Sequence, residues 1–271
     1  MVMGPTHALS GAAVWLAGSA IADAFYDFHQ TPAELVVGTI VCAGGSLLPD
    51  LDCAGRVLKN RGGSTVARAF GPVTMVMAEA TERIAWGFYS ITRTKKDGKR
   101  NNGHRTLTHT WFFAALIGVL FGWLGWKFGK PAVIPILFFM IGLAMRGLMA
   151  EVAREKGWFV VTVVSGVGAF GAARLLPPDG RAYWLIGVAV AAGCVIHTLG
   201  DIITKMGCPL FFPLPIKKQV WFEIGVPDKM AVKVGGTVEK KILAPGFTIV
   251  AGISAIALLP EVRAAIVALL Q

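Results

Sequence analysis

The chain has 271 residues, of which 55% are hydrophobic and only 15% are charged, against roughly 25% charged in a soluble domain. Its mean hydropathy of +0.63 excludes a disordered chain, a disulfide scaffold and most ordinary soluble enzymes. The formal net charge is +10, and a chain that is both basic and apolar suits either nucleic acid or a membrane. The apolar runs described next decide for the membrane, so we expect no nucleic acid partner.

Apolar runs near the ~20 residues that cross a bilayer recur along the whole chain. They lie at Leu9–Phe28, Ala33–Leu48, His109–Phe128, Ala132–Ala150, Trp158–Leu176, Tyr183–Thr204 and Leu243–Leu259. The sequence therefore predicts an all-α, polytopic helical membrane protein with about six to seven transmembrane helices in one membrane-embedded domain, residues 1–271. Met1–His7 carries no Lys or Arg, so a signal-peptide n-region is missing and we expect the first span to stay in the mature protein.

Two polar segments interrupt the spans. Residues 51–108 are expected to form a cytoplasmic or interfacial insertion that contains a helix over Gly71–Ile91 and a turn-rich loop over Thr94–Gly103. Residues 205–241 are expected to form a cytoplasmic loop. Short alternating apolar runs, split by Pro-Asp and Gly-Gly, favour a small β-hairpin cap within residues 216–241 of that loop.

The basic residues predict the orientation. Eleven Lys and Arg residues fall in residues 51–108 and seven in residues 205–241, whereas the loops expected on the other side hold four. The positive-inside rule then places the N-terminus and both long segments in the cytoplasm. Anionic membrane lipids account for the net charge, and membrane lipids are the expected partners.

Histidine and aspartate residues gather at the ends of spans that this orientation places on the cytoplasmic side. His197 and Asp201 stand four residues apart and so share one helix face. Pro49 should end the second helix and leave two carboxylates on a turn, and Thr106 or Thr108 should cap the third span, leaving His109 in its first turn. The residues expected to converge are His7, Asp50, Asp52, His104, His109, His197 and Asp201.

Imidazole and carboxylate ligands together suit a divalent metal, zinc first and manganese or iron as alternatives. Such an ion lowers the pKa of a bound water toward ~7 and makes it available for hydrolysis. Each residue alone has a simpler reading, since histidine is common at helix ends and aspartate at solvated turns. Glu79 is either a solvated helix residue or a general base, and Cys53 and Cys208 are either packing residues or further ligands.

Four sequence blocks carry a family resemblance. They are Thr6-His7, Leu48-Pro49-Asp50-Leu51-Asp52, His104-Arg105-Thr106-Leu107-Thr108-His109 and His197-Thr198-Leu199-Gly200-Asp201, in this order. From Thr6 to Pro215 the chain resembles the YdjM-like family of bacterial and archaeal inner-membrane proteins, which are named as metal-dependent hydrolases. It also looks distantly similar to the zinc phospholipase C and P1 nuclease superfamily. The resemblance implies that His7, Asp50, His104, His109, His197 and Asp201 are the metal ligands.

These observations lead to a membrane-bound, metal-dependent hydrolase of the inner membrane, with its metal site on the cytoplasmic side. The expected substrate is a phosphate ester, most simply of a lipid, and Asp52 or Glu79 is the expected catalytic base. Two alternatives remain: a transporter or metal-handling protein without hydrolysis, and a non-catalytic protein whose basic segments bind lipid or a partner.

Overall fold

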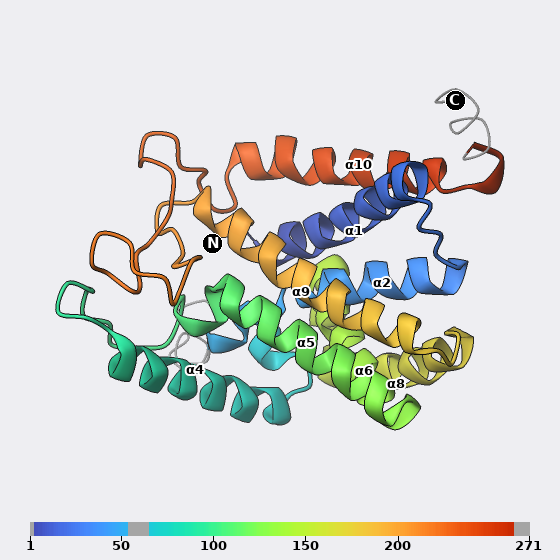
Figure 1. Cartoon of the computed structure of the whole chain (residues 1–271), viewed down its shortest axis with the longest axis horizontal. Helices are drawn as coiled ribbons and strands as arrows, with labels where there is room; N and C mark the ends of the chain where they lie inside the picture. Colours follow the sequence, from blue (N-terminus) through green and yellow to red (C-terminus); the bar gives the residue numbers. More distant parts are fainter. Residues whose placement is uncertain (1–2, 54–64, 263–271) are drawn as a thin grey trace.

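The structure is a computed structural model that describes residues 3–53 and 65–262. Seven apolar helices pack into one bundle (Figure 1). They are α1 (Gly4–Tyr26), α2 (Pro32–Gly45), α5 (Trp111–Phe128), α6 (Lys130–Leu148), α8 (Gly157–Leu175), α9 (Gly180–Ile202) and α10 (Ala244–Ala257). Each belongs to a segment long and apolar enough to cross a membrane, the second extending to Asp52 and the last running from Glu239. The prediction of an all-α membrane protein with about six to seven spans is therefore confirmed.

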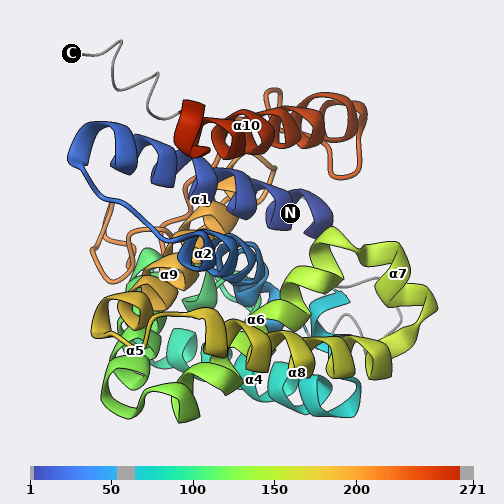
Figure 2. The ribbon, with the colours of Figure 1, turned by 90° about the vertical axis from the view of Figure 1, so that its right-hand side faces the viewer.

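The bundle is organised around α2, which is seen end on near the middle of Figure 2. Glycines let its neighbours approach closely. A Cβ atom on Gly44 would lie 2.2 Å from the Met140 carbonyl oxygen of α6, and one on Gly193 of α9 would lie 2.4 Å from the Cys42 oxygen of α2. Small residues allow such close backbone contacts between membrane helices. By contrast, α10 lies on the outside of the bundle, against α1 (Figure 2).

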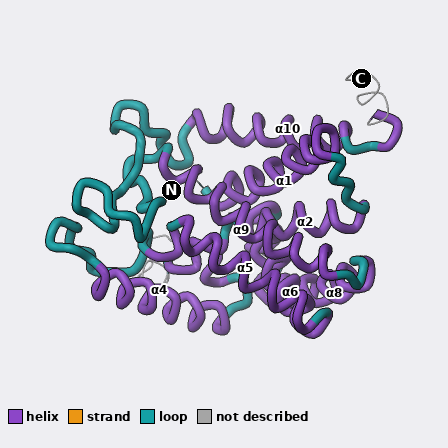
Figure 3. The backbone as a smooth tube through the Cα atoms, in the orientation of Figure 1, coloured by secondary structure: helices purple, strands orange, loops and turns teal. Residues whose placement is uncertain are grey.

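Long loops gather at one end of the bundle (Figure 3). The first turns of α1 and α5 and the last turns of α2 and α9 meet at that same end. This arrangement is the one expected from the sequence, because alternate spans bring their ends to one face. α1 begins at Gly4, five residues earlier than predicted, with Pro5 in its first turn. His7 therefore lies inside this helix rather than ahead of it.

The predicted helix of the first polar segment is confirmed as α4 (Pro72–Thr92). It lies obliquely at the loop-bearing end, against the 3₁₀ turns η1 (Leu48–Asp52), η2 (Thr65–Arg68) and η3 (Leu107–His109). Its buried residues are Thr74, Ala78, Ala85 and Tyr89, a spacing that places them on one helix face. Apolar side chains on the remaining surface are exposed, among them Val76 and Ile91.

The predicted β-hairpin cap in residues 216–241 is wrong. All of these residues are described, and the loop of which they are part contains only two isolated bridges, Cys208 with Ile224 and Ile216 with Gln219. The backbone donors that a second strand would need are used elsewhere. The amides of Val220 and Trp221 donate to the Asp97 carboxylate, and the Val226 amide donates to the end of α9. The short helix α7 (Ala150–Glu155) and the π-helical turn η4 (Glu239–Leu243) are the remaining described elements.

Candidate metal centre

Seven of the eight predicted site residues lie together at the loop-bearing end of the bundle. None of these seven is more than 6% exposed. They come from the first turn of α1, from η1, from the loop that leads into α5 and from the last turns of α9. The seven residues are His7, Asp50, Asp52, His104, His109, His197 and Asp201.

The end of α2 positions the two carboxylates of η1. The helix stops at Gly45, and Pro49 lies in the first turn of η1, as expected for a residue that lacks an amide donor. The Ser46 hydroxyl donates to the His7 carbonyl oxygen at 2.7 Å, which ties the end of α2 to the start of α1. Leu48 and Leu51 are buried and anchor the turn that carries Asp50 and Asp52.

The imidazoles of His109 and His197 face each other with their Nε2 atoms 3.2 Å apart. The Nδ1 atom of His197 lies 2.8 Å from the Ser46 carbonyl oxygen, which only accepts hydrogen bonds, so Nδ1 carries the proton. The Nδ1 atom of His109 lies 3.0 Å from the Thr108 hydroxyl and 3.3 Å from the Asp52 carboxylate. Both Nε2 atoms therefore present lone pairs to each other, and a cation between them removes the repulsion.

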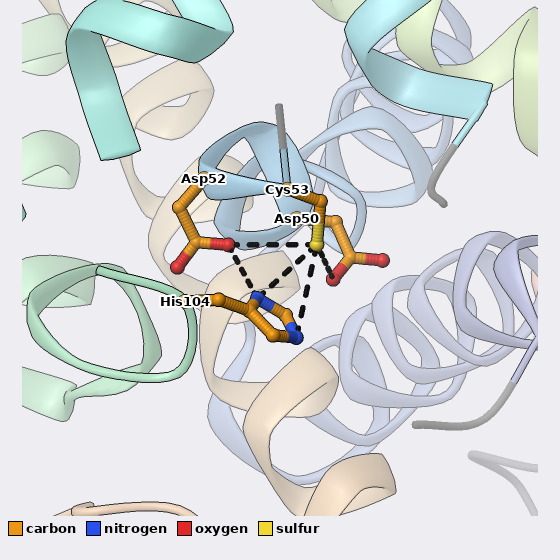
Figure 4. A group of neighbouring side chains, drawn as sticks. All are labelled: Asp50, Asp52, Cys53 and His104. Carbon is orange, nitrogen blue, oxygen red and sulfur yellow. Dashed lines mark hydrogen bonds and ion pairs between the residues drawn. The ribbon is translucent and has the colours of Figure 1, made fainter. Parts of the chain in front are cut away.

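Asp52 holds two of the histidines. Its Oδ1 atom lies 2.7 Å from Nδ1 of His104 (Figure 4). Its Oδ2 atom accepts from the Thr108 hydroxyl at 2.5 Å and from the Arg105 amide at 3.2 Å. With His109 also within 3.3 Å, this one carboxylate keeps the proton on Nδ1 of two imidazoles. This assigns the lone pairs of His104 and His109 to Nε2, the ring nitrogen that does not contact Asp52.

Asp201 and His7 complete the cluster from the outer helices. The Asp201 carboxylate forms an ion pair with the Arg105 guanidinium at 2.8 Å, and both side chains are only 0–1% exposed. Arg105 has a φ of 57° and also donates to the Gly207 carbonyl oxygen at 3.1 Å. Arg105 thereby positions the Asp201 carboxylate. His7 stacks on His197 at 4.1 Å, and its Nε2 lies 3.5 Å from Asp201 Oδ1. Among the described residues, neither ring nitrogen of His7 makes a hydrogen bond.

The spacing of the donor atoms fits one metal ion. Four donors at zinc distances of 2.0–2.2 Å lie about 3.4 Å apart in a tetrahedron. The Nε2 atoms of His109 and His197 lie 3.6 and 3.8 Å from Asp201 Oδ2, and 3.9 and 3.8 Å from Asp50 Oδ1. These residues form two overlapping groups, Asp50 with His109 and His197, and His7 with His197 and Asp201. Both groups use the same Nε2 lone pair of His197, so they belong to one metal centre.

The charge of the cluster also favours a cation. Asp50, Asp52 and Asp201 are buried, and Arg105 is the buried positive side chain that the described part of the chain pairs with them. With neutral histidines and all three carboxylates ionised, the group would carry an excess of two negative charges, and burying such an excess without compensation is costly. One divalent ion neutralises it. The buried residues thus fit a divalent metal by geometry and by charge.

Glu79 lies outside this cluster. It is on the exposed side of α4, where it forms an i,i+4 ion pair with Arg83 at 2.5 Å. Glu79, Glu82 and Arg83 line a cavity of about 310 Å³ that is closed on its other side by Asn101–Gly103, directly before His104.

Two local predictions about the loop before α5 are corrected. Thr110, rather than Thr106 or Thr108, caps α5 by accepting from the Phe113 amide at 3.0 Å. Thr108 is used by Asp52 instead, and His109 lies in η3, ahead of α5. Both differences follow from the 3₁₀ turn, which the helical pattern of the sequence does not reveal.

The two cysteines near the cluster differ. Burial, followed by the neighbouring Asp201 carboxylate, raises the pKa of the Cys208 thiol. It therefore stays neutral and donates weakly to Asp201 at 3.9 Å. Cys53, in contrast, lies 3.1 Å from Nδ1 of His104 and belongs, with Asp50, Asp52 and His104, to a group of side chains that could hold a metal ion. Its position next to Asp52 was the only sequence signal for this role.

Comparison with known proteins identifies the family. A family model described as YdjM inner membrane protein matches residues 1–259. No curated protein and no solved structure matches the chain, so similarity to zinc phospholipase C or P1 nuclease is not shown. The family match covers nearly the whole chain and agrees with the seven apolar helices. The protein is therefore a multi-pass inner membrane protein, and it belongs to the YdjM inner membrane protein family.

Proposed function

We propose that this protein is a metal-dependent hydrolase that cleaves a phosphate ester of a membrane lipid at the cytoplasmic interface. The observation that supports it most strongly is the pair of Nε2 lone pairs of His109 and His197, 3.2 Å apart. With the protons of both imidazoles on Nδ1, a cation between the two Nε2 atoms would stabilise this buried arrangement. Hydrolysis by an activated water is a chemistry that such a histidine and carboxylate centre supports.

Zinc is the proposed metal, with manganese or iron as alternatives. Neutral imidazole and carboxylate oxygens are the ligands of catalytic zinc sites. Nε2 of His109 and His197, Oδ1 of Asp50 and Oδ2 of Asp201 would hold it, with His7 next to His197. When bound, a divalent ion supplies an activated water and an electrophile for a phosphoryl oxygen.

The protein side chains have separate tasks in this proposal. Asp52 positions His104 and His109 through their Nδ1 atoms, so it is committed to orientation. Arg105 holds Asp201 in place. Glu79 keeps the role of candidate base, because it lines the same cavity as Gly103, the residue directly before His104. A carboxylate there can accept a proton from a water that enters through the cavity.

The location of the centre supports a lipid substrate. It lies at the ends of helices, next to the loops that carry most of the basic residues. Under the positive-inside rule this end faces the cytoplasm, where the basic residues attract anionic headgroups. A transporter would place its polar groups near the middle of the spans, at broken helices. The position at the helix ends therefore favours the hydrolase over the transporter.

Metal analysis of detergent-purified protein is the first test. We expect near-stoichiometric zinc or manganese in the wild type and its loss in the His109→Ala/His197→Ala double variant. His29→Ala is the matched control, because His29 is an exposed histidine paired with Asp23 and Asp27 away from the centre. Absence of metal from the wild type after reconstitution at neutral pH would overturn the proposal.

Activity is the second test. The metal-loaded protein should hydrolyse phosphate esters of lipids presented in mixed micelles, and the double variant should not. Turnover of soluble phosphate esters alone would refute the lipid substrate. A metal-loaded protein without any esterase activity would favour the metal-handling alternative.

A further inference from the structure

We propose that α4 lies on the membrane leaflet at the loop-bearing end of the bundle, with an exposed apolar stripe among the acyl chains and a basic cluster against anionic phospholipid headgroups. The helix lies at the edge of the bundle in both views (Figures 1 and 2) and is not one of the seven apolar spans. The inference needs neither a metal nor a reaction, so it goes beyond the proposed function and can fail independently of it.

α4 has a second apolar face besides the buried one. Six of its residues are apolar, exposed and three or four positions apart: Val73, Met77, Ala80, Ile84, Phe88 and Ile91. This spacing places them in one continuous stripe along the helix. Ile84 is 65% exposed and Ile91 is 86% exposed. A contiguous exposed apolar surface of this kind marks an interaction site.

The remaining face of α4 is polar. It carries Glu79, Glu82, Arg83 and Ser90. A helix with an apolar stripe and a polar face lies in the plane of the membrane interface, with its apolar side at the boundary of the acyl chains. The three faces of α4 therefore suit three surroundings, which are the protein, the lipid and water.

Basic residues follow the stripe directly. Four exposed ones lie within eight residues of Ile91: Arg93, Lys95, Lys96 and Lys99. The acidic residue among them, Asp97, is 6% exposed and accepts hydrogen bonds from the Val220 and Trp221 amides, so it faces the protein. The outward charge of this segment is therefore positive, which suits an anionic lipid surface. A second copy laid parallel along the stripe would bring two such clusters together, which like-charge repulsion opposes.

The stripe continues the exposed surface of a membrane span. α4 starts beside the first turn of α8, since a Cβ atom on Gly71 would lie 2.9 Å from the Trp158 ring. Trp158 is 48% exposed and its neighbour Phe159 is 65% exposed, and aromatic residues at the ends of spans lie at the level of the headgroups. Val73, the first residue of the stripe, comes only two positions after Gly71. The stripe therefore begins at the headgroup level.

α4 also connects this lipid surface with the metal centre. Its buried face packs against η1 and η3, the turns that carry Asp50, Asp52 and His109. The loop that leads to His104 is equally close, because a Cβ atom on Gly103 would lie 2.1 Å from the Glu82 carbonyl oxygen of α4. A helix docked on lipid thus holds the centre beside the headgroups.

Quenching by brominated lipid tests the inference. All four cysteines of the chain are buried, so a new exposed cysteine can be labelled selectively with a fluorophore. Ile84→Cys places the label in the stripe, and Ser90→Cys is the control, exposed but about 120° away around the same helix. The full chain is reconstituted at one copy per nanodisc, in phosphatidylglycerol and phosphatidylcholine with bromine on the acyl chains. We expect the label at Ile84 to be quenched several-fold more strongly than the label at Ser90.

Reversing two charges tests the basic cluster. Each lysine near an anionic surface contributes about fivefold to the attraction, so Lys95→Glu/Lys96→Glu should weaken docking by about 25-fold or more and lower the quenching at Ile84. The matched control is Lys127→Glu/Lys130→Glu, which reverses two exposed lysines at the opposite end of α5 and the start of α6. It should leave the quenching unchanged.

Equal quenching of the two labels would overturn the lipid surface, as would a label at Ile84 that is accessible to iodide in water. A label shielded from both lipid and iodide would place the stripe against protein and overturn it too. Unchanged quenching in Lys95→Glu/Lys96→Glu would overturn the role of the anionic headgroups. Ile91→Cys repeats the measurement at another exposed stripe position if Ile84→Cys does not fold. Metal content and hydrolysis do not enter the readout, so failure of the proposed function would leave this test unaffected.

Discussion

Replacing Gly193 by alanine should separate α9 from α2 and disable the metal centre without touching a ligand. A Cβ atom at this position would lie 2.4 Å from the Cys42 oxygen, 2.6 Å from the Ser46 nitrogen and 2.7 Å from the Gly45 carbonyl carbon. All three are backbone atoms of α2 or its end, so no side chain can move aside. Restoring ordinary contact requires the two helices to move apart by roughly 1 Å, the kind of strain that overpacking causes.

His197 lies one turn further along α9 and would move with it. Its hydrogen bond to the Ser46 carbonyl oxygen is 2.8 Å long, and a shift of roughly 1 Å takes it beyond hydrogen-bonding range. Overpacking costs about 1–3 kcal/mol and the lost hydrogen bond about 1 kcal/mol more. The expected destabilisation is about 2–4 kcal/mol. Loss of the group that orients His197 should lower zinc affinity by about 10–100-fold.

The assay is thermal unfolding in detergent, with and without zinc, together with a chelator competition that gives the zinc Kd. Gly166→Ala on α8 is the control, since a Cβ atom there would meet nothing within 4 Å. It should leave the Kd unchanged and should not lower the unfolding temperature, because alanine is more favourable than glycine in a helix interior. Wild-type zinc affinity in Gly193→Ala would show that the close contact of α2 and α9 does not position His197, and the reasoning would fail.

Three further outcomes follow from the contacts of the centre. Asp52→Asn should weaken zinc binding by about 10–100-fold, because an amide cannot accept from both His104 and His109; an unchanged Kd by chelator competition would contradict this role. Arg105→Met should destabilise the protein by about 3–5 kcal/mol, because it leaves the buried Asp201 carboxylate without its positively charged partner; unfolding in detergent measures this loss. The double variant Arg105→Met/Asp201→Asn should recover part of the lost stability. Equal stability of the single and double variants would argue against the ion pair. Zinc occupancy after dialysis should be lower at about pH 5 than at about pH 7.5, because protons compete for the imidazole lone pairs and metal affinity falls as pH falls; occupancy independent of pH would speak against histidine ligands.

The sequence predicted the spans and the converging residues for simple physical reasons. A span is ~20 apolar residues long, and His7, Asp50, His109 and Asp201 each lie near a span end that faces the same way. The roles within the cluster could not be predicted this way. That Asp52 holds two histidines depends on the 3₁₀ turns η1 and η3, which have no hydropathy signal.

The prediction of a β-hairpin in residues 216–241 was wrong for a different reason. Alternating apolar residues predict a strand only when the neighbouring backbone is available for pairing. Here the Asp97 carboxylate, more than a hundred residues earlier in the chain, takes the amides of Val220 and Trp221. A side chain so distant in sequence cannot be connected with these amides from the pattern of residues alone. The same limit hid the contact between Ser46 and His197.

The origin of the ligands in distant chain segments has a consequence for how the protein is made. His7 leaves the ribosome with the first of these seven spans, whereas His197 and Asp201 follow only with the sixth. During synthesis the early histidine and the carboxylates of η1 are already in the membrane while their partners do not yet exist. The complete centre can capture its ion only after α9 has inserted and packed against α2, so metal loading marks the completion of the folded core.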